Sequence, residues 1–235
     1  MLELNTFSIT ARCERTGQFG IAVSTKVPAV GALCPYVKAG VGAVASQSFV
    51  NPYIGINGLK YLGEGLTAKA VKERILSEDP QPEIRQFAIV DKEGQSAAYT
   101  GEKCVGWHGH NEGDGFVAAG NMLVGEETIK EMARIFEATS ELKLSERLLQ
   151  ALEAGQAAGG DKRGKQSAAL KVVSTESYPL VDLRVDEHKD PVTELRRVYE
   201  VAKYELFPFI ETLPTKENPL GQMDLATQKE LGLLD

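Results

Sequence analysis

Thr6 is the residue near the N-terminus whose type and position best suit covalent chemistry. It opens the alternating segment TFSITA at 6–11, and five residues, MLELN, precede it. A threonine hydroxyl is inert at neutral pH without a base, but the pKa of a free α-amino group is about 8, so part of it is neutral at pH 7. If residues 1–5 were removed, Thr6 would therefore supply both a nucleophile and its base. Otherwise, Thr6 is an ordinary strand residue.

Serine and lysine residues close to the same strand ends are further candidates. Ser24 and Lys26 close the second expected strand, beside the start of the first strand in a hairpin, and Lys38 lies just before the third. Buried lysines change their pKa readily, so either lysine could assist Thr6 or act as the base for Ser24 or Ser48. Both lysines are equally consistent with solvated side chains.

Small residues dominate the segment GVGAVASQS at 40–48, which ends in Ser46, Gln47 and Ser48. Small residues let a backbone approach a substrate, so the N–H groups of this segment could form an oxyanion hole. The alternative is a tightly packed buried strand. Asn51, which follows in the motif NPYIG, is a further candidate for substrate binding.

The segment AGGDKRGKQSA at 158–168 combines helix-breaking glycines with polar side chains before an apolar strand. Its polar candidates are Asp161, Arg163, Gln166 and Ser167. The guanidinium of Arg163 could bind a substrate carboxylate through two parallel hydrogen bonds. Alternatively, the segment is a helix C-terminal turn with an internal salt bridge. Asn121 and Gln166 could orient a substrate.

The histidines and cysteines do not form a metal-binding pattern. His108 and His110 are two residues apart on a glycine-rich segment and His188 is distant, whereas a metal site needs three or four converging ligands. The three cysteines are widely spaced and form no CxxC motif, which disfavours a disulfide framework or a structural zinc site. We therefore predict no metal and no cofactor, and expect His110 to line a pocket.

Charge and hydropathy restrict the partners of the chain. The net charge is −7 and the pI is about 5.2, which argues against nucleic acid or an anionic membrane as a partner. No signal peptide is visible and no apolar run approaches the length of a membrane span. We expect a cytoplasmic protein that acts on a small molecule. Apolar residues near the C-terminus, Ile210, Leu213 and Leu225, indicate a homodimer or a larger homo-oligomer.

Strands and helices that come in blocks must position these residues. Alternating segments predict strands at 6–12, 19–24, 40–48, 85–90, 95–100, 104–105, 116–119, 166–174 and 180–188. Helical spacing of apolar residues predicts helices at 67–77, 125–139, 143–158 and 192–206. Blocks of strands disfavour a parallel sheet. We predict an α+β fold, a four-layer αββα sandwich of two antiparallel sheets, over residues 1–210, with a peripheral tail at 211–235.

Several short motifs are spread over the chain from residue 6 to about residue 206. They are TFSI from Thr6, AVG at 29–31, AGVGAVASQS at 39–48, NPYIG at 51–55, RQFAIVD at 85–91, GN at 120–121, AGGDKRGKQSA at 158–168 and VDLRVDEH at 181–188. Together with the element order, they resemble the N-terminal-nucleophile (Ntn) hydrolases, and more closely the uncharacterised Ntn-hydrolase-like family DUF1028. The resemblance implies that Thr6 is the nucleophile, often exposed by self-cleavage. It also implies that Asp161 and Ser167 support Thr6, as in hydrolases of the proteasome type.

Three hypotheses of function follow. The leading one is an Ntn-type amidohydrolase in which Thr6 attacks a small, charged amide and forms an acyl-enzyme. The second is a non-catalytic binding or assembly protein on the same scaffold, which the residues before Thr6 favour because they mask its amine. The third is a hydrolase with an internal serine nucleophile, Ser24 or Ser48, and with Lys26 or Lys38 as the base.

Overall fold

Two antiparallel sheets form the centre of the molecule. The structure, a computed structural model, describes residues 6–232 and divides into two compact units, the first ending at Arg196 and the second starting at Arg197. The sheets of the first unit have the strand orders β10-β9-β2-β1-β8-β7 and β3-β4-β5-β6. The strands are β1 (Thr6–Arg12), β2 (Phe19–Thr25), β3 (Pro35–Lys38), β4 (Gly42–Ser48), β5 (Arg85–Asp91), β6 (Ser96–Thr100), β7 (Trp107–Gly113), β8 (Phe116–Leu123), β9 (Ser167–Val173) and β10 (Val181–Val185). The predicted α+β class with two antiparallel sheets is confirmed.

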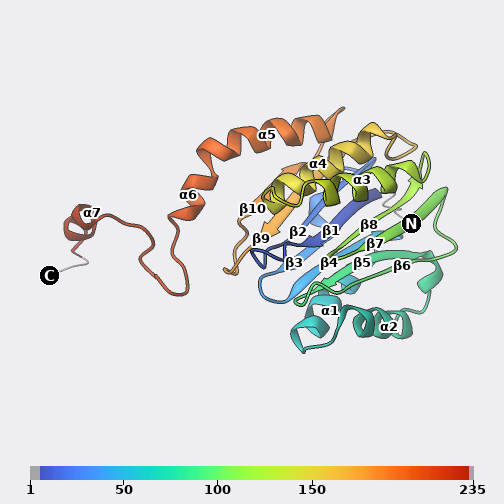
Figure 1. Cartoon of the computed structure of the whole chain (residues 1–235), viewed down its shortest axis with the longest axis horizontal. Coiled ribbons are helices and arrows are strands. Elements are labelled where there is room, and N and C mark those ends of the chain that lie inside the picture. Colours follow the sequence, from blue (N-terminus) through green and yellow to red (C-terminus); the bar gives the residue numbers. More distant parts are fainter. Residues whose placement is uncertain (1–5, 233–235) are drawn as a thin grey trace. The chain divides into compact units, whose positions relative to one another are not determined.

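Helices cover the outer face of each sheet, so the layers of the first unit follow the order helix, sheet, sheet, helix (Figure 1). The helices α1 (Pro52–Gly63) and α2 (Ala68–Glu78) pack on the four-stranded sheet. The helices α3 (Glu127–Ala138) and α4 (Leu144–Ala157) pack on the six-stranded sheet. The side chain of Thr67 caps α2 by accepting the N–H of Ala70.

Alternation along β1 decides which of its side chains meet the second sheet. Phe7 faces the helical layer, where a Cβ added to Gly155 of α4 would lie 3.2 Å from its ring. Ser8 faces the other way and donates a hydrogen bond of 2.8 Å to Gln47 on the four-stranded sheet. Thr6 has the same parity as Ser8 and therefore faces the space between the sheets. The core in that space is otherwise mostly aliphatic, with side chains such as Ile21, Val23, Ala45, Ala88 and Val117.

The helix α1 is absent from the sequence prediction because its segment is rich in glycine. Glycine disfavours an isolated helix, yet here it permits close packing. A Cβ at Gly55 would lie 2.1 Å from the ring of Tyr36, and one at Gly58 would lie 3.1 Å from Val44. The packing of α1 on the sheet therefore outweighs its low intrinsic propensity.

Two strand predictions are also corrected. Residues 104–105 are not a strand, and the strand in this region is β7, from Trp107 to Gly113. It lacks an alternating apolar pattern because β7 is an edge strand whose residues are all half-buried or exposed. Lys38 precedes the strand predicted at 40–48, which is β4, but it also ends the strand β3 (Pro35–Lys38), which the sequence analysis missed because four residues are too few for alternation to reveal.

The second unit contains the end of α5 (Pro191–Glu205), α6 (Phe207–Glu211) and α7 (Leu225–Glu230). Its exposed large apolar side chains are Val201, Tyr204, Phe209, Leu220 and Leu231. Ile210 and Leu213 are half-buried, and the side chain of Leu225 lies outside the described part of the chain. Self-association and the domain boundary at 210/211 stay predictions. Within residues 6–232, no helix combines the length and the apolar character needed to cross a membrane.

Candidate functional site

Polar side chains from neighbouring strands form a row at one end of the six-stranded sheet. Thr6 on β1 lies opposite Thr25 on β2, which lies opposite Ser167 on β9. Continuing the β1–β8 register by one residue, from Phe7 opposite Gly120, places Asn121 on the other side of Thr6. We call Asn121, Thr6, Thr25 and Ser167 the polar row. All four are buried between the sheets, and the Thr6 hydroxyl donates a hydrogen bond of 3.3 Å to the Thr25 hydroxyl.

Ser167 anchors the loop that follows β2. Its hydroxyl donates to the carbonyl of Val27 at 2.5 Å and accepts the N–H of Val30 at 3.1 Å. Gln166 acts here through its backbone, because its N–H donates to the carbonyl of Thr25 at 2.9 Å. These contacts position the loop and the end of β2, and among the hydrogen bonds that the structure records Ser167 makes none to Thr6.

Asp161 holds the other side of the same strand end. Its side chain is 1% exposed and accepts a hydrogen bond of 3.1 Å from the N–H of Lys26, the residue that follows Thr25. The guanidinium of Arg163, which is 33% exposed, contacts the same carboxylate at 2.8 Å. The internal salt bridge of the turn is therefore present, and the fork of Arg163 is directed at Asp161.

The structure does not bring a lysine to either internal serine. The ammonium of Lys26 donates to the carbonyl of Lys165 at 3.3 Å. Lys38 is exposed and lies opposite Gly42, which is five residues, or about 17 Å along β4, from Gln47. Ser24 lies opposite Phe7, so it faces the helical layer, and its hydroxyl donates to the carbonyl of Ser167 at 3.2 Å.

Three buried amides connect the two sheets beside the polar row. Gln47 donates to Gln86 at 2.8 Å, and Asn121 donates to the same Gln86 oxygen at 2.9 Å. Gln86 in turn lies within hydrogen-bond distance of the carbonyls of Gly109 (3.1 Å) and Gly120 (2.8 Å). Among the described residues, the side-chain oxygen Oδ1 of Asn121 is buried and has no hydrogen-bond partner.

Sequence reasoning missed Thr25 and Gln86, although alternation contains a signal for both. In the β1–β2 hairpin, Thr25 and not Ser24 lies opposite Thr6. Along β5, Phe87 and Ile89 face the helices, so Gln86 has the parity of the inter-sheet face. A polar residue at an inward parity of a strand is the pattern that identifies them.

Ser48, the last residue of β4, has a φ of 68°, which lies in the left-handed region. Met122, next to Asn121, has a φ of 53°. Non-glycine residues adopt this region at a cost and do so preferentially at functional sites. The Ser46 hydroxyl donates to the carbonyl of Asn51 at 3.0 Å. Asn51 is the N-cap of α1, because its side-chain oxygen accepts the N–H of Tyr53.

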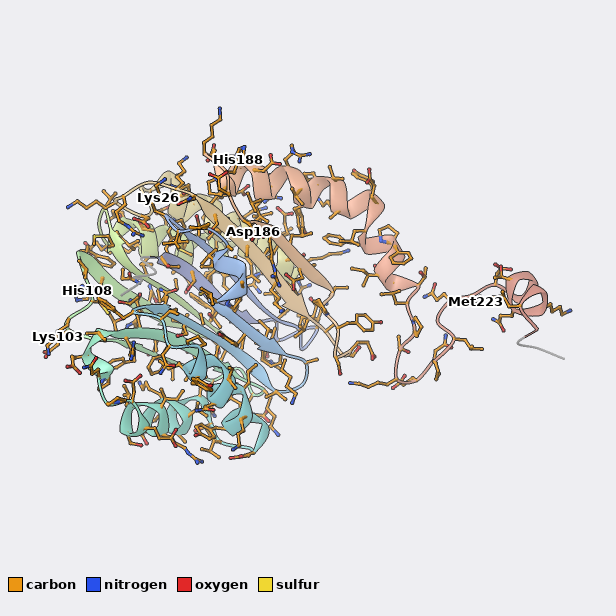
Figure 2. All side chains as sticks on the ribbon, turned by 180° about the vertical axis from the view of Figure 1, so that it is seen from behind. Lys26, Lys103, His108, Asp186, His188 and Met223 are labelled. Atoms are coloured by element: carbon orange, nitrogen blue, oxygen red, sulfur yellow. The ribbon has the colours of Figure 1, made fainter. Side chains whose placement is uncertain are left out.

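His110 lies on β7, the edge strand of the six-stranded sheet. Its Nδ1 is 2.8 Å from the hydroxyl of Thr100, and burial lowers the pKa of its imidazole, which favours the neutral form at pH 7. It lines a pocket of about 470 Å³ together with Trp107 and Lys130. Figure 2 shows His108 and His188 on separate parts of the molecule, and the described residues contain no group of His, Cys, Asp and Glu side chains that could hold a metal ion.

Two neutral variants of Asp161 test whether its carboxylate stabilises the end of β2. Asp161→Ala removes the acceptor of the Lys26 N–H and leaves Arg163 without its carboxylate, so we expect the free energy of unfolding to fall by about 3 kcal/mol. Asp161→Asn keeps an oxygen that can accept the same N–H and should lose less. Urea denaturation of both variants measures the difference. Equal losses below about 0.5 kcal/mol would show that Asp161 does not hold this strand end.

Asp79 gives a second test, through pH, because it binds the cap of α1. Burial alone would raise the pKa of the Asp79 carboxyl, but hydrogen bonds from the Gln81 N–H and from Arg85, both 2.9 Å, outweigh burial and lower it. Asn51 donates a third hydrogen bond at 3.2 Å. A carboxyl whose folded-state pKa is depressed stabilises the protein above its unfolded-state pKa, about 3.9.

We therefore expect Asp79→Asn to be less stable than the original protein at neutral pH. The gap should be constant down to about pH 5 and should narrow as the pH falls through the folded-state pKa, below about 3.9. Chemical denaturation of both proteins across this range measures the gap. A gap that stays constant down to the lowest pH at which both fold would contradict the assignment.

The chain resembles one family of known proteins in both sequence and structure. Residues 6–195 match the family described as "Family of unknown function (DUF1028)". The chain is similar to the crystal structure of protein SPO2555 from Silicibacter pomeroyi, of the same family, with a TM-score of 0.85 and 29% identity over 94% of this chain and 100% of that one. No curated protein matches the chain.

Two structures of Anbu, an ancestral beta-subunit, show lower similarity. Anbu from Yersinia bercovieri gives a TM-score of 0.39 and 10% identity over 89% of this chain and 98% of that one. A Gly-1 mutant of Anbu from Hyphomicrobium sp. strain MC1 gives a TM-score of 0.37 and 14% identity over 89% of this chain and 100% of that one.

Proposed function

The chain belongs to the DUF1028 family, a family of unknown function, and we propose that this member is an N-terminal-nucleophile hydrolase of small amides that uses Thr6. The observation that carries the proposal is the polar row. Buried hydroxyl and amide groups cost desolvation free energy, so their concentration at one end of a mostly aliphatic core favours a site over simple packing. Thr6 lies in the middle of this row, at the first residue of β1.

Removal of residues 1–5 would give Thr6 the base that its hydroxyl needs. The free α-amine would accept the hydroxyl proton while Oγ1 attacks the carbonyl carbon of the amide. The tetrahedral intermediate would collapse with transfer of that proton to the leaving amine, which gives an ester on Thr6. Water, deprotonated by the same α-amine, would then cleave the ester and release the acid. The family match begins at Thr6, which supports treating residues 1–5 as an extension outside the common sequence.

Two further features, one at the end of β4 and one at Asn121, support roles in charge stabilisation and orientation. The left-handed turn at Ser48 directs the backbone out of the regular strand at the end of β4, where an N–H could stabilise an oxyanion. The unpartnered side-chain oxygen Oδ1 of Asn121 could accept a hydrogen bond from the Thr6 amine or from the N–H of a substrate amide. In this proposal, Asp161 and Ser167 act as positioning residues, because Asp161 binds the N–H of Lys26 and Ser167 binds the backbone of Val27 and Val30 in the loop that follows β2. Substrate contacts by Gln166 and His110 stay predictions.

One observation favours the alternative of a binding or assembly protein. Thr6 is fully buried, so a substrate cannot reach its hydroxyl in this state. Catalysis therefore depends on a processing step that a binding protein would not need. The third hypothesis, an internal serine with a lysine base, gains no support, because Lys26 is engaged with a backbone carbonyl and Lys38 is remote.

Intact mass, N-terminal sequencing and amide hydrolysis on the same preparation test the proposal. We expect active protein to begin at Thr6 and to release amine from members of a panel of small charged amides. A chain that retains residues 1–5 and still hydrolyses an amide would exclude Thr6 as an N-terminal nucleophile. A chain that begins at Thr6 and hydrolyses no member of the panel would favour the binding protein.

A further inference from the structure

A second pocket lies at the opposite end of β1 from Thr6. Its volume is about 510 Å³, and its lining includes Arg12, Arg15 and Arg147. Arg12 is the last residue of β1, six residues from Thr6, which corresponds to about 20 Å along the strand. The pocket is therefore separate from the polar row, and its role does not depend on the function proposed for Thr6.

Two of the three guanidinium groups, those of Arg12 and Arg147, have no carboxylate partner among the described residues. Among the described residues, the Arg12 guanidinium has no hydrogen bond or ion pair, and its Nε is buried. The Nε of Arg147 is also buried without a partner, although its Nη2 donates to the carbonyl of Phe136 at 3.0 Å. The Arg147 guanidinium lies 3.9 Å from the centroid of the Phe136 ring. A half-buried charge without a counter-charge is unfavourable, so both groups favour a bound anion.

The remaining arginine is held in place by the protein. Nη2 of Arg15 donates to the carbonyls of Ser140 and Leu142 at 3.0 and 2.9 Å. Its Nη1 is 4.0 Å from the exposed carboxylate of Glu141. The side chain of Arg15 is thus held by the protein at one side of the pocket. Arg12 and Arg147 contribute the positive charge that has no carboxylate partner.

Exposed carboxylates on the rim restrict the charge of the ligand. Glu14, Glu93 and Asp114 line the same pocket and are exposed, and none of them is ion-paired with Arg12. These negative groups repel an anion with several charges and attract an ammonium group. Guanidinium groups bind carboxylates through paired hydrogen bonds. We propose that this pocket binds a small zwitterion, with its carboxylate on Arg12 and Arg147 and its amino group toward the acidic rim.

Three ligands with five-carbon chains separate the contributions of charge. The zwitterion 5-aminopentanoate, the monoanion pentanoate and the dianion glutarate share a chain length and differ at one end. Ligand-observed NMR titration of the full chain at constant ionic strength should give the order 5-aminopentanoate, then pentanoate, then glutarate. Tighter binding of glutarate than of 5-aminopentanoate, or binding of none of the three, would overturn the proposal.

Variants locate the ligand. Arg12→Gln should weaken 5-aminopentanoate binding by about tenfold, as expected for loss of a charge-assisted hydrogen bond, while Arg12→Lys should retain part of it. The control Arg184→Gln removes an arginine of β10 that does not line the pocket, and it should leave binding unchanged. A thermal melt checks that each variant is folded. Equal binding by Arg12→Gln and the original protein would overturn the assignment.

Cys13 provides a second readout at the pocket wall. Burial alone would raise the pKa of its thiol, but hydrogen bonds from Thr16 and Arg15 outweigh burial and, with the charge of Arg147, lower it. The thiols of Cys34 and Cys104 are internal controls, because burial raises their pKa, to about 12 for Cys34. We expect 5-aminopentanoate to slow iodoacetamide alkylation of Cys13 alone, measured by peptide mass spectrometry. Unchanged alkylation under a ligand that binds would place it elsewhere.

Discussion

Thr6→Ala is expected to abolish amide hydrolysis, lowering kcat/KM by about 10⁴-fold or more, and to retain residues 1–5 if the chain cleaves itself. The variant lacks the hydroxyl that would attack both the amide and the preceding peptide bond. It also loses the hydrogen bond to Thr25, so the free energy of unfolding should fall by about 1 kcal/mol. Intact mass, amine release and chemical denaturation measure the three effects on the same preparation.

The same strand offers a matched control. Thr10 lies on the same face of β1 as Thr6 and is also fully buried, and its hydroxyl has no hydrogen-bond partner among the described residues. Thr10→Ala should therefore process normally and keep its turnover. Thr6→Ser retains a hydroxyl and should keep part of the activity. Processing and turnover by Thr6→Ala at the rate of Thr10→Ala would remove Thr6 from the chemistry.

Gln86→Ala is expected to lower the free energy of unfolding by about 4 kcal/mol, which is large for a single substitution. Gln86 is fully buried and connects the amides of Gln47 and Asn121, both of which donate to its oxygen. Its nitrogen also donates to Thr100 and to the carbonyl of Gly120, at 2.9 and 2.8 Å. Alanine would leave these groups buried without partners, and each such group costs free energy.

Chemical denaturation measures this effect, and an exposed glutamine provides the control. Gln95 lies in the turn between β5 and β6, close in sequence to Gln86 but exposed. Gln95→Ala should change the free energy of unfolding by no more than about 0.5 kcal/mol. A loss below about 1 kcal/mol for Gln86→Ala would indicate that water replaces its hydrogen bonds and that the amides do not hold the two sheets in register.

Local pattern in the sequence was sufficient for most of the elements. The strands at 6–12 and 19–24 and the helices near 127–138 and 144–157 follow from periodicity, because each needs only its own alternating or helical spacing of apolar residues. The cap of α2 at Thr67 is local in the same way. The order of strand and helix blocks then indicated two antiparallel sheets. Alternation along β1 was sufficient to place Thr6 and Phe7 on opposite faces of the sheet.

The tertiary structure decided which polar side chains meet. Thr25 became the neighbour of Thr6 through the register of the hairpin, and Asn121 became its other neighbour through pairing with a strand more than 100 residues away. Gln86 joins the site only because two sheets stack. Tertiary structure also excludes Lys38 from the site, because β3 pairs with β4 so that Lys38 lies at the end of β4 that is remote from Gln47. Register and sheet stacking depend on contacts between distant segments, and a pattern within one segment carries no information about them.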